Sequence, residues 1–151
     1  MVIRTKIFGE IDVNTEKLIS FPDGIIGFPD LKQFMLIYDE DKKDSNISWL
    51  QSIDEPAFAL PVINPLKVED DYNPMVEDEL LSKLGNLKPE NMLVLVTITV
   101  PSDITKMTVN LKAPIVINAE ENKGAQIIVY DEAYEIKHPI YDKLKKKRSD
   151  V

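Results

Sequence analysis

The sequence contains no cysteine and only one histidine, His138. The lack of cysteine excludes disulfides, thiolate metal ligands and cysteine nucleophiles, and it is consistent with a reducing compartment. A single histidine cannot form a two-histidine zinc motif. Because His138 precedes Pro139, we expect it in an extended segment with a structural role.

Glycine-based phosphate loops and long apolar runs are also missing. The five glycines, at positions 9, 24, 27, 85 and 124, form neither a dinucleotide-binding fingerprint nor a P-loop. The longest apolar-rich run, residues 92–100, is too short to span a bilayer, and residues 1–8 do not resemble a signal peptide. We therefore expect a cytoplasmic protein that does not contact membranes and has no catalytic residue, cofactor or metal ion.

Negative charge dominates the chain. It has 26 acidic and 18 basic residues, for a net charge of −8. Five of the basic residues lie at positions 143–148, so the part before residue 143 has 13 basic and 25 acidic residues, a net charge of −12. Such a body repels phosphate backbones and attracts basic proteins. The alternative is that the charge only maintains solubility.

Alternating or continuous apolar patterns predict short strands along most of the chain. The expected strands are residues 3–8, 17–21, 34–38, 48–53, 57–63, 92–100, 107–112, 115–118 and 126–130, with a turn at 120–124. The fold class is therefore mainly β: a compact antiparallel β-barrel-like single domain with one short helix. We expect this domain to span residues 1–142, followed by a charged, flexible tail at 143–151.

The one expected helix is residues 76–84. Its apolar face consists of Leu80, Leu81 and Leu84. Three acids at 77–79 occupy the first turn, where the helix dipole favours negative charge, and Gly85 provides the stop. Elsewhere, Asn110 and Asn118 are expected to satisfy backbone groups at strand ends.

The strand at 48–53 contains the only tryptophan, Trp49, which we expect in the core. The polar pair Gln51 and Ser52 interrupts this apolar run, so we expect one face there to reach solvent or a partner.

Two acidic segments are candidate sites. The first comprises Asp39, Glu40, Asp41, Asp44 and Asn46. It superficially suggests calcium but lacks the central glycine and closing glutamate of an EF-hand loop, so a solvated loop is favoured.

The second acidic segment, residues 69–79, has six acids and no base. Acids steer a basic partner and an aromatic ring can anchor it, so we take Glu69, Asp70, Asp71 and Tyr72 as candidate partner-binding residues. The alternative interpretation is a charged loop that leads into a helix.

Three ordered blocks of sequence resemble those of the FliW flagellar assembly factors. The first block is FGEI at 8–11 with ISFPDGIIGF at 19–28, and the second is WLQSI at 49–53 with FALPV at 58–62. The third is TVNLKAPIVIN at 108–118 with GAQ at 124–126 and HPI at 138–140. The resemblance covers residues 3–141 and excludes the lysine-rich tail.

This resemblance implies a β-barrel-like protein that acts by protein–protein interaction rather than catalysis. Its implied partners are flagellin, bound in the cytoplasm like a chaperone client, and CsrA, a translational regulator that binds RNA. Family members antagonise CsrA, and unsecreted flagellin captures the factor and frees CsrA. We expect no direct contact with nucleic acid and a monomer when free. The alternatives are a small carboxylate-based or divalent-metal-dependent enzyme, and a nucleic-acid mimic.

Overall fold

The computed structural model describes residues 1–38 and 47–144. The calcium candidate formed by Asp39, Glu40, Asp41, Asp44 and Asn46 lies outside the described residues, as does the tail from residue 145 onward. The strands are β1 (Val2–Thr5), β2 (Gly9–Asp12), β3 (Ile19–Ser20), β4 (Gln33–Tyr38), β5 (Ile47–Ser52), β6 (Ala59–Ile63), β7 (Met92–Thr99), β8 (Thr108–Val109), β9 (Ile115–Asn118), β10 (Lys123–Gln126) and β11 (His138–Pro139).

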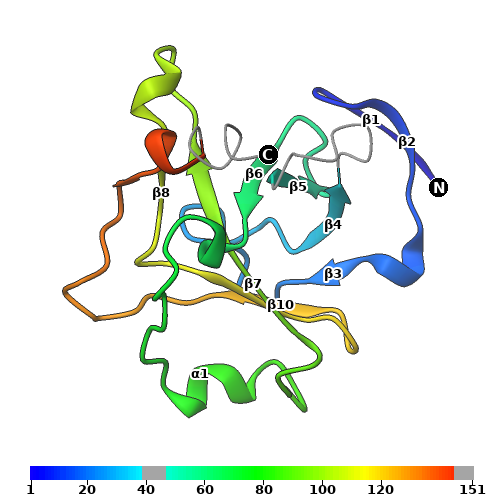
Figure 1. The fold of residues 1–151 in the computed structure, drawn as a ribbon. Helices are drawn as coiled ribbons and strands as arrows, with labels where there is room; N and C mark the ends of the chain where they lie inside the picture. Colours follow the sequence, from blue (N-terminus) through cyan, green and yellow to red (C-terminus); the bar gives the residue numbers. More distant parts are fainter. Residues whose placement is uncertain (39–46, 145–151) are drawn as a thin grey trace.

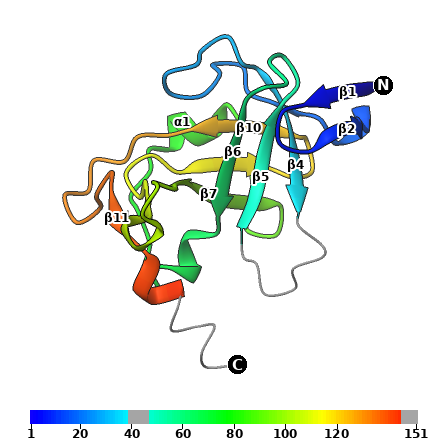
Figure 2. The same cartoon turned by 90° about the horizontal axis from the view of Figure 1, so that it is seen from above.

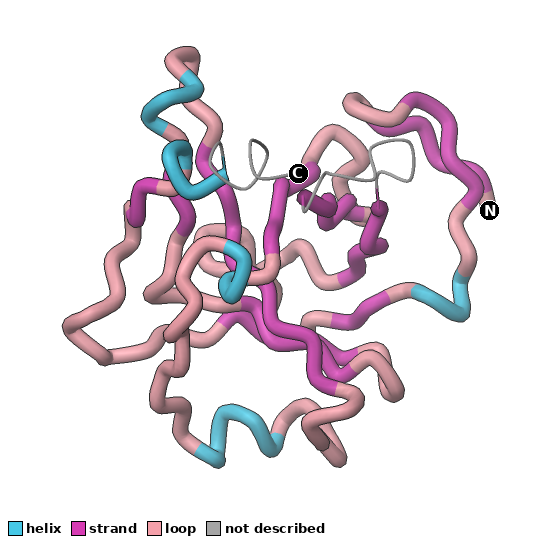
Figure 3. Tube along the Cα trace, in the orientation of Figure 1, coloured by secondary structure: helices cyan, strands magenta, loops and turns pink. Residues whose placement is uncertain are grey.

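Helical segments in the described residues are short and lie outside the strands (Figure 3). They include the 3₁₀ turns η1 (Thr15–Lys17), η2 (Pro65–Lys67) and η3 (Ile104–Lys106), and the α-helix α1 (Asp78–Ser82). The prediction of a helix at 76–84 is confirmed in place but is too long. Residues 141–144 form a further helical turn, so the prediction of one helix was incomplete.

Seven strands close into a barrel, which confirms the predicted fold class. Their order is β7-β6-β5-β4-β3-β10-β9, and β9 pairs again with β7. All neighbouring pairs in this ring are antiparallel except β3 and β10, which are parallel and joined at one register pair, Ser20 with Lys123. Figure 2 shows β4, β5 and β6 side by side.

Two small additions extend this barrel. Strand β8 pairs with the end of β7, and β11 pairs with β8. Strands β1 and β2 form a separate antiparallel ribbon at the upper right of Figure 1. The sequence prediction treated residues 3–8 as one strand, but the chain turns at 6–8 and returns as β2.

Three buried clusters hold the structure together. The barrel interior contains Phe21, Phe34, Leu50, Val62, Ile115 and Ile117. A second cluster, which includes Val68, Tyr72, Leu111 and Ile140, lies beside it. A third joins Leu84, Val116 and Ile127, with Leu80 and Leu81 packed against it. Strand β9 is therefore buried on both faces, which explains its continuous apolar sequence.

The expectation for Gln51 and Ser52 is wrong, because both side chains are completely buried. The Gln51 Nε2 donates to the carbonyls of Ser52, Pro56 and Phe58 at 2.9, 3.0 and 3.2 Å. The Ser52 hydroxyl accepts from the Glu55 backbone N–H at 3.0 Å. The pair thus closes the turn between β5 and β6 instead of facing solvent or a partner.

Trp49 is half-buried and lies outside the three buried clusters, contrary to the expected core position. It pairs across the sheet with Ile37 and Pro61, and the Phe8 ring meets it edge-on with centroids 5.8 Å apart. Its alternation with the buried Leu50 places it on the outer face of the barrel.

The predicted turn at 120–124 is shifted toward the N-terminus. The turn spans residues 119–122, where Asn122 has a φ of 54°, and Gly124 lies within β10. A Cβ at Gly124 would lie 2.5 Å from Cζ of Phe21, so this glycine is required by the close approach of a core ring.

Candidate functional site

The candidate acidic residues lie on the connection between η2 and α1. Asp70 and Asp71 are exposed and Glu69 is partly exposed, so the structure brings the three predicted acids together on one surface loop. The Asp70 carboxylate accepts a hydrogen bond from Lys143 Nζ at 3.0 Å. Lys143 and Leu144, which we assigned to the tail, lie in the helical turn at 141–144, and Leu144 packs against the second buried cluster.

Tyr72 has a different placement from the one we expected, because its side chain is only 8% exposed. Its hydroxyl donates to the Leu111 carbonyl at 2.7 Å. Its ring meets that of Tyr134 edge-on, with centroids 4.7 Å apart. Burial, together with Tyr134 and Asp131, raises the pKa of the Tyr72 phenol. Tyr72 therefore anchors the acidic loop to the barrel, and only a small part of its surface is accessible to a partner.

Two further hydrogen bonds fasten the loop that follows Tyr72. The backbone N–H of Asn73 donates to the Tyr134 hydroxyl at 2.8 Å. The backbone N–H of Met75 donates to the Asp131 carboxylate at 3.3 Å. Residues 131–134 thus act as a strap that holds residues 72–75 in one position relative to the barrel.

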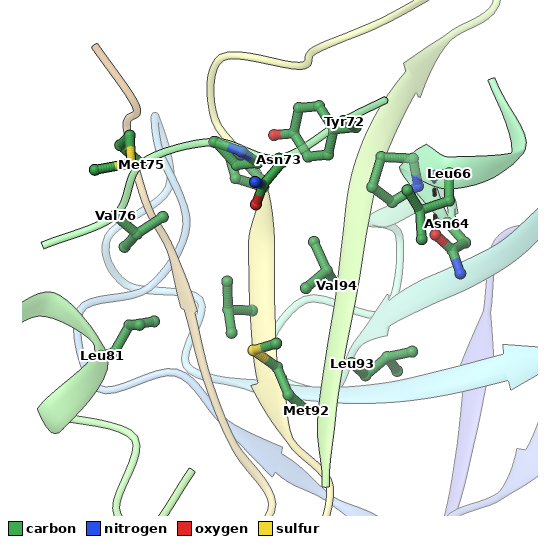
Figure 4. A pocket seen from close by; sticks show the side chains of 14 residues that line it. Asn64, Leu66, Tyr72, Asn73, Met75, Val76, Leu81, Met92, Leu93 and Val94 are labelled. Atoms are coloured by element: carbon green, nitrogen blue, oxygen red, sulfur yellow. Dashed lines mark hydrogen bonds between the residues drawn. The ribbon is translucent and has the colours of Figure 1, made fainter. Parts of the chain in front are cut away.

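This fastened loop forms one wall of an apolar groove of about 560 Å³. The groove is lined by Asn64, Pro65, Leu66, Tyr72, Asn73, Pro74, Met75, Val76, Leu81, Met92, Leu93, Val94, Pro114 and Val116. Figure 4 shows Val76 and Leu81 on one side, Leu66 and Asn64 on the other, and Met92 between them. Strands β7 and β9 supply the floor, and η2 and α1 supply opposite sides.

The η2 side is specified locally by the sequence. The Asn64 side chain caps the turn by accepting from the Leu66 backbone N–H at 3.0 Å, and Pro65 occupies a first-turn position. Asparagine at the cap and proline just inside it are a favourable start for a helical turn. The result places the Leu66 side chain on the groove with 51% of its surface exposed.

The α1 side is specified partly by distant residues. Gly85, with a φ of +80°, ends the helical segment. The Asn118 side chain, fully buried at the end of β9, donates from Nδ2 to the Leu84 carbonyl at 2.7 Å. This bond fixes the end of the helical segment on the barrel, as expected for an asparagine at a strand end.

Sequence reasoning did not identify the groove. Its most exposed apolar side chains are Met75 (81%), Leu66 (51%) and Met92 (42%), which come from three separate segments. Met75 and Val76, two apolar residues inside an acidic segment, were the local signal.

The groove presents apolar surface and the acidic loop presents negative charge. Among residues 1–38 and 47–144, no group of three or more histidine, cysteine, aspartate or glutamate side chains is placed to hold a metal ion.

His138 pairs with Val109 through β11 and β8. No helix of the described part is both long and apolar enough to cross a membrane.

Comparison with known proteins gives one consistent result. The family model described as FliW protein matches residues 2–140. Flagellar assembly factor FliW of Lachnoclostridium phytofermentans is 54% identical over 144 residues, covering 95% of this chain and 92% of that protein. The protein of the same name from Lachnospira eligens is 50% identical over 151 residues, covering 99% and 100%.

A solved structure agrees with the sequence matches. The crystal structure of the flagellar assembly factor FliW superposes with a TM-score of 0.85 at 30% identity, covering 93% of this chain and 97% of that one. The closed barrel thus defines this chain as a β-barrel protein of the class of flagellar assembly factors. The match over residues 2–140 places it more narrowly: the chain belongs to the FliW family.

Proposed function

We propose that this protein binds flagellin in the cytoplasm and antagonises the translational regulator CsrA, so that flagellin synthesis follows flagellin secretion. Membership of the FliW family, with a match over residues 2–140, is the observation that carries the proposal. The protein acts as a monomer when free and makes contact with other proteins, without chemistry on a substrate and without touching nucleic acid.

The acidic loop supports a basic protein as one partner. Glu69, Asp70 and Asp71 project from a loop that Tyr72 anchors to the barrel, so their charges are held in place before a partner arrives. Carboxylates on such a loop attract a partner that carries lysine and arginine for RNA binding. We assign these three acids to the contact with CsrA, and we assign Tyr72 the task of positioning them.

The coupling follows from linked equilibria. Flagellin that occupies the protein weakens the apparent affinity for CsrA by a factor set by the flagellin concentration relative to its dissociation constant. When flagellin accumulates, it therefore displaces CsrA from this protein. When flagellin is secreted, this protein is free to bind CsrA again. This scheme does not require the two partners to touch the same surface.

The test is a titration of purified CsrA and of purified flagellin into the protein. In the variant with Glu69→Lys, Asp70→Lys and Asp71→Lys, CsrA binding should weaken at least tenfold while the thermal midpoint stays within a few degrees. The matched control changes three other exposed acids to lysine: Glu16, Asp30 and Glu90. Because both variants change the net charge equally, general charge effects cancel.

Equal CsrA affinities of the two variants would remove the acidic loop from the proposed contact. Wild-type protein that binds neither flagellin nor CsrA would refute the proposed function as a whole.

A further inference from the structure

The apolar groove is already formed in this chain without a bound partner. Its loop wall is held through Tyr72 to Leu111 and through the backbone of Asn73 and Met75 to the strap at 131–134. Its α1 wall is held through Leu84 to Asn118. A wall that does not have to be ordered on binding lowers the entropic cost of docking.

Part of this groove surface is apolar and uncovered. Met75, Leu66 and Met92 are each at least 42% exposed and come from the loop, η2 and β7 (Figure 4). Two of the three are methionines, whose unbranched, polarisable side chains repack around different apolar surfaces. Contact between such a surface and the apolar side chains of a partner is more favourable than contact with water.

The charges around the groove restrict what can enter it. The wall residues 72–76 follow directly after Glu69, Asp70 and Asp71, and they directly precede Glu77, Asp78 and Glu79. Acids therefore stand at both ends of this wall. The segment 69–79 has no lysine or arginine of its own, although Lys143 pairs with Asp70 at its start. An apolar segment with acidic flanks would be repelled here, whereas basic flanks would be attracted.

We propose that this groove is the docking site for a segment of a partner protein that inserts long apolar side chains and carries lysine or arginine on either side of them. The inference rests on the proposed function, since it names the chemistry of the partner segment that this protein captures. The apolar side chains cover Leu66, Met75 and Met92, and the basic flanks meet the acids at 69–71 and 77–79.

A second copy of this chain is a poorer occupant. A two-fold dimer through this groove would bring the acidic segment of both copies into one interface, and the segment 69–79 contributes no lysine or arginine to pair with those acids. Like charges across such an interface oppose association.

Methionine methyl groups provide a direct test with internal controls. The chain has five methionines, of which Met75 and Met92 line the groove, while Met1, Met35 and Met107 do not. The full-length protein, labelled with ¹³C at the methionine methyls, is titrated with three synthetic peptides. They are an amphipathic leucine–lysine peptide, a leucine–glutamate peptide of the same pattern, and a serine–lysine peptide of the same charge.

The leucine–lysine peptide should shift the Met75 and Met92 signals and leave the other three in place. The other two peptides should bind at least tenfold more weakly, because each lacks either the charge or the apolar side chains. Equal binding of the leucine–glutamate peptide, or shifts confined to Met1, Met35 and Met107, would overturn the proposal. Shifts of Met75 and Met92 with protein concentration alone would overturn it in favour of a second copy.

A matched pair of variants connects the groove with the natural partners. The double variant Met75→Ser, Met92→Thr should lose about tenfold or more in affinity for the peptide and for flagellin or CsrA, because each exposed methionine is covered on docking. The control Ile104→Ser removes an apolar side chain that is 54% exposed in η3, outside the groove, and should retain both affinities.

The two failures are distinguishable. If wild-type protein binds flagellin and CsrA and the double variant binds them equally well, the groove inference is wrong and the proposed function stands. If wild-type protein binds neither, the proposed function fails, and the methyl titration still decides whether the groove takes an apolar segment with basic flanks.

Discussion

Asn118 and Leu84, 34 residues apart in the chain, are joined by a hydrogen bond of 2.7 Å from the side-chain amide to the main-chain carbonyl. The same side chain accepts from the backbone N–H groups of Glu120 and Glu121 at 3.0 and 3.1 Å. One buried asparagine thus joins the β9–β10 turn to the end of the segment that walls the groove.

Replacement of Asn118 by alanine should therefore destabilise the protein by about 2–4 kcal/mol, since the buried Leu84 carbonyl and two partly buried N–H groups of the turn lose their partner. Urea unfolding of the variant and the wild type measures the difference. A change below about 0.5 kcal/mol would show that water replaces the side chain at no cost.

The substitution Tyr72→Phe tests whether Tyr72 anchors the acidic loop or contacts the partner directly. The change removes the hydroxyl that donates to Leu111 and keeps the ring, so we expect a loss of about 1–2 kcal/mol in unfolding free energy. Because the ring is buried, CsrA affinity should change less than twofold. A large loss of affinity with unchanged stability would instead make Tyr72 a contact residue.

The raised pKa of Tyr72 leads us to expect that the unfolding free energy falls at alkaline pH. Burial raises the pKa of its phenol above the ordinary value of about 10, so the unfolded state releases the proton first. The contribution of the neutral phenol is complete below pH 10 and is lost as the pH rises toward the folded pKa. Above pH 10, the unfolding free energy of Tyr72→Phe should fall less steeply than that of wild type, by up to about 1.4 kcal/mol per pH unit. Parallel curves would contradict this assignment.

Gly124→Ala tests the contact between β10 and the core. The added Cβ would meet the Phe21 ring at 2.5 Å, and we expect a cost of about 1–3 kcal/mol from overpacking. The second change Phe21→Leu should make the alanine less costly, which a double-mutant cycle of unfolding free energies measures. Strictly additive effects would show that the ring is not the obstacle.

Removal of residues 145–151 tests charge steering. The deletion takes away four basic residues and one acid and changes the net charge from −8 to −11, while Lys143 and its ion pair with Asp70 remain. Association with CsrA should become faster at low salt, and the difference should shrink at high salt. Stopped-flow association rates at two ionic strengths provide the measurement, and a slower rate would indicate that the tail itself contacts the partner.

Calorimetric titration with calcium and with magnesium separates the proposed binding function from a metal-dependent enzyme. We expect no stoichiometric heat from either ion. A saturable signal with one ion per protein would favour the enzyme alternative, and substitution of Asp39, Asp41 and Asp44 by asparagine would then test the acidic segment as its source.

Local sequence patterns predicted much of the fold because strand alternation and turn chemistry act over a few residues. The runs at 34–38 and 115–118 coincide with β4 and β9 to within one residue. The run at 126–130 did not form the strand we expected. The strand in this region, β10, begins at Lys123 and ends at Gln126. There, pairing with β9 fixed the register, and the apolar residues that follow lie beyond it.

The candidate site was predicted only in part. Asp70 and Asp71 are exposed, and Glu69 is partly so, as a run of charge near a helix start indicates. Tyr72 has the same local sequence context and is buried, because Leu111 and Tyr134 reach it from elsewhere in the chain. Gln51 is also buried but for a local reason, since its amide finds three carbonyls within its own hairpin.

The sequence by itself determined the mainly β character, the absence of cysteine chemistry, the acidic segment at 69–79 and the resemblance to FliW, since composition, short-range periodicity and motif order all lie along the chain. Only the tertiary structure decided that β9 returns to β7 to close the barrel, that Tyr72 faces inward, and that Leu66, Met75 and Met92 share one groove. The physical reason is that burial and apposition depend on side chains that arrive from distant segments, and no local pattern encodes which segments those are.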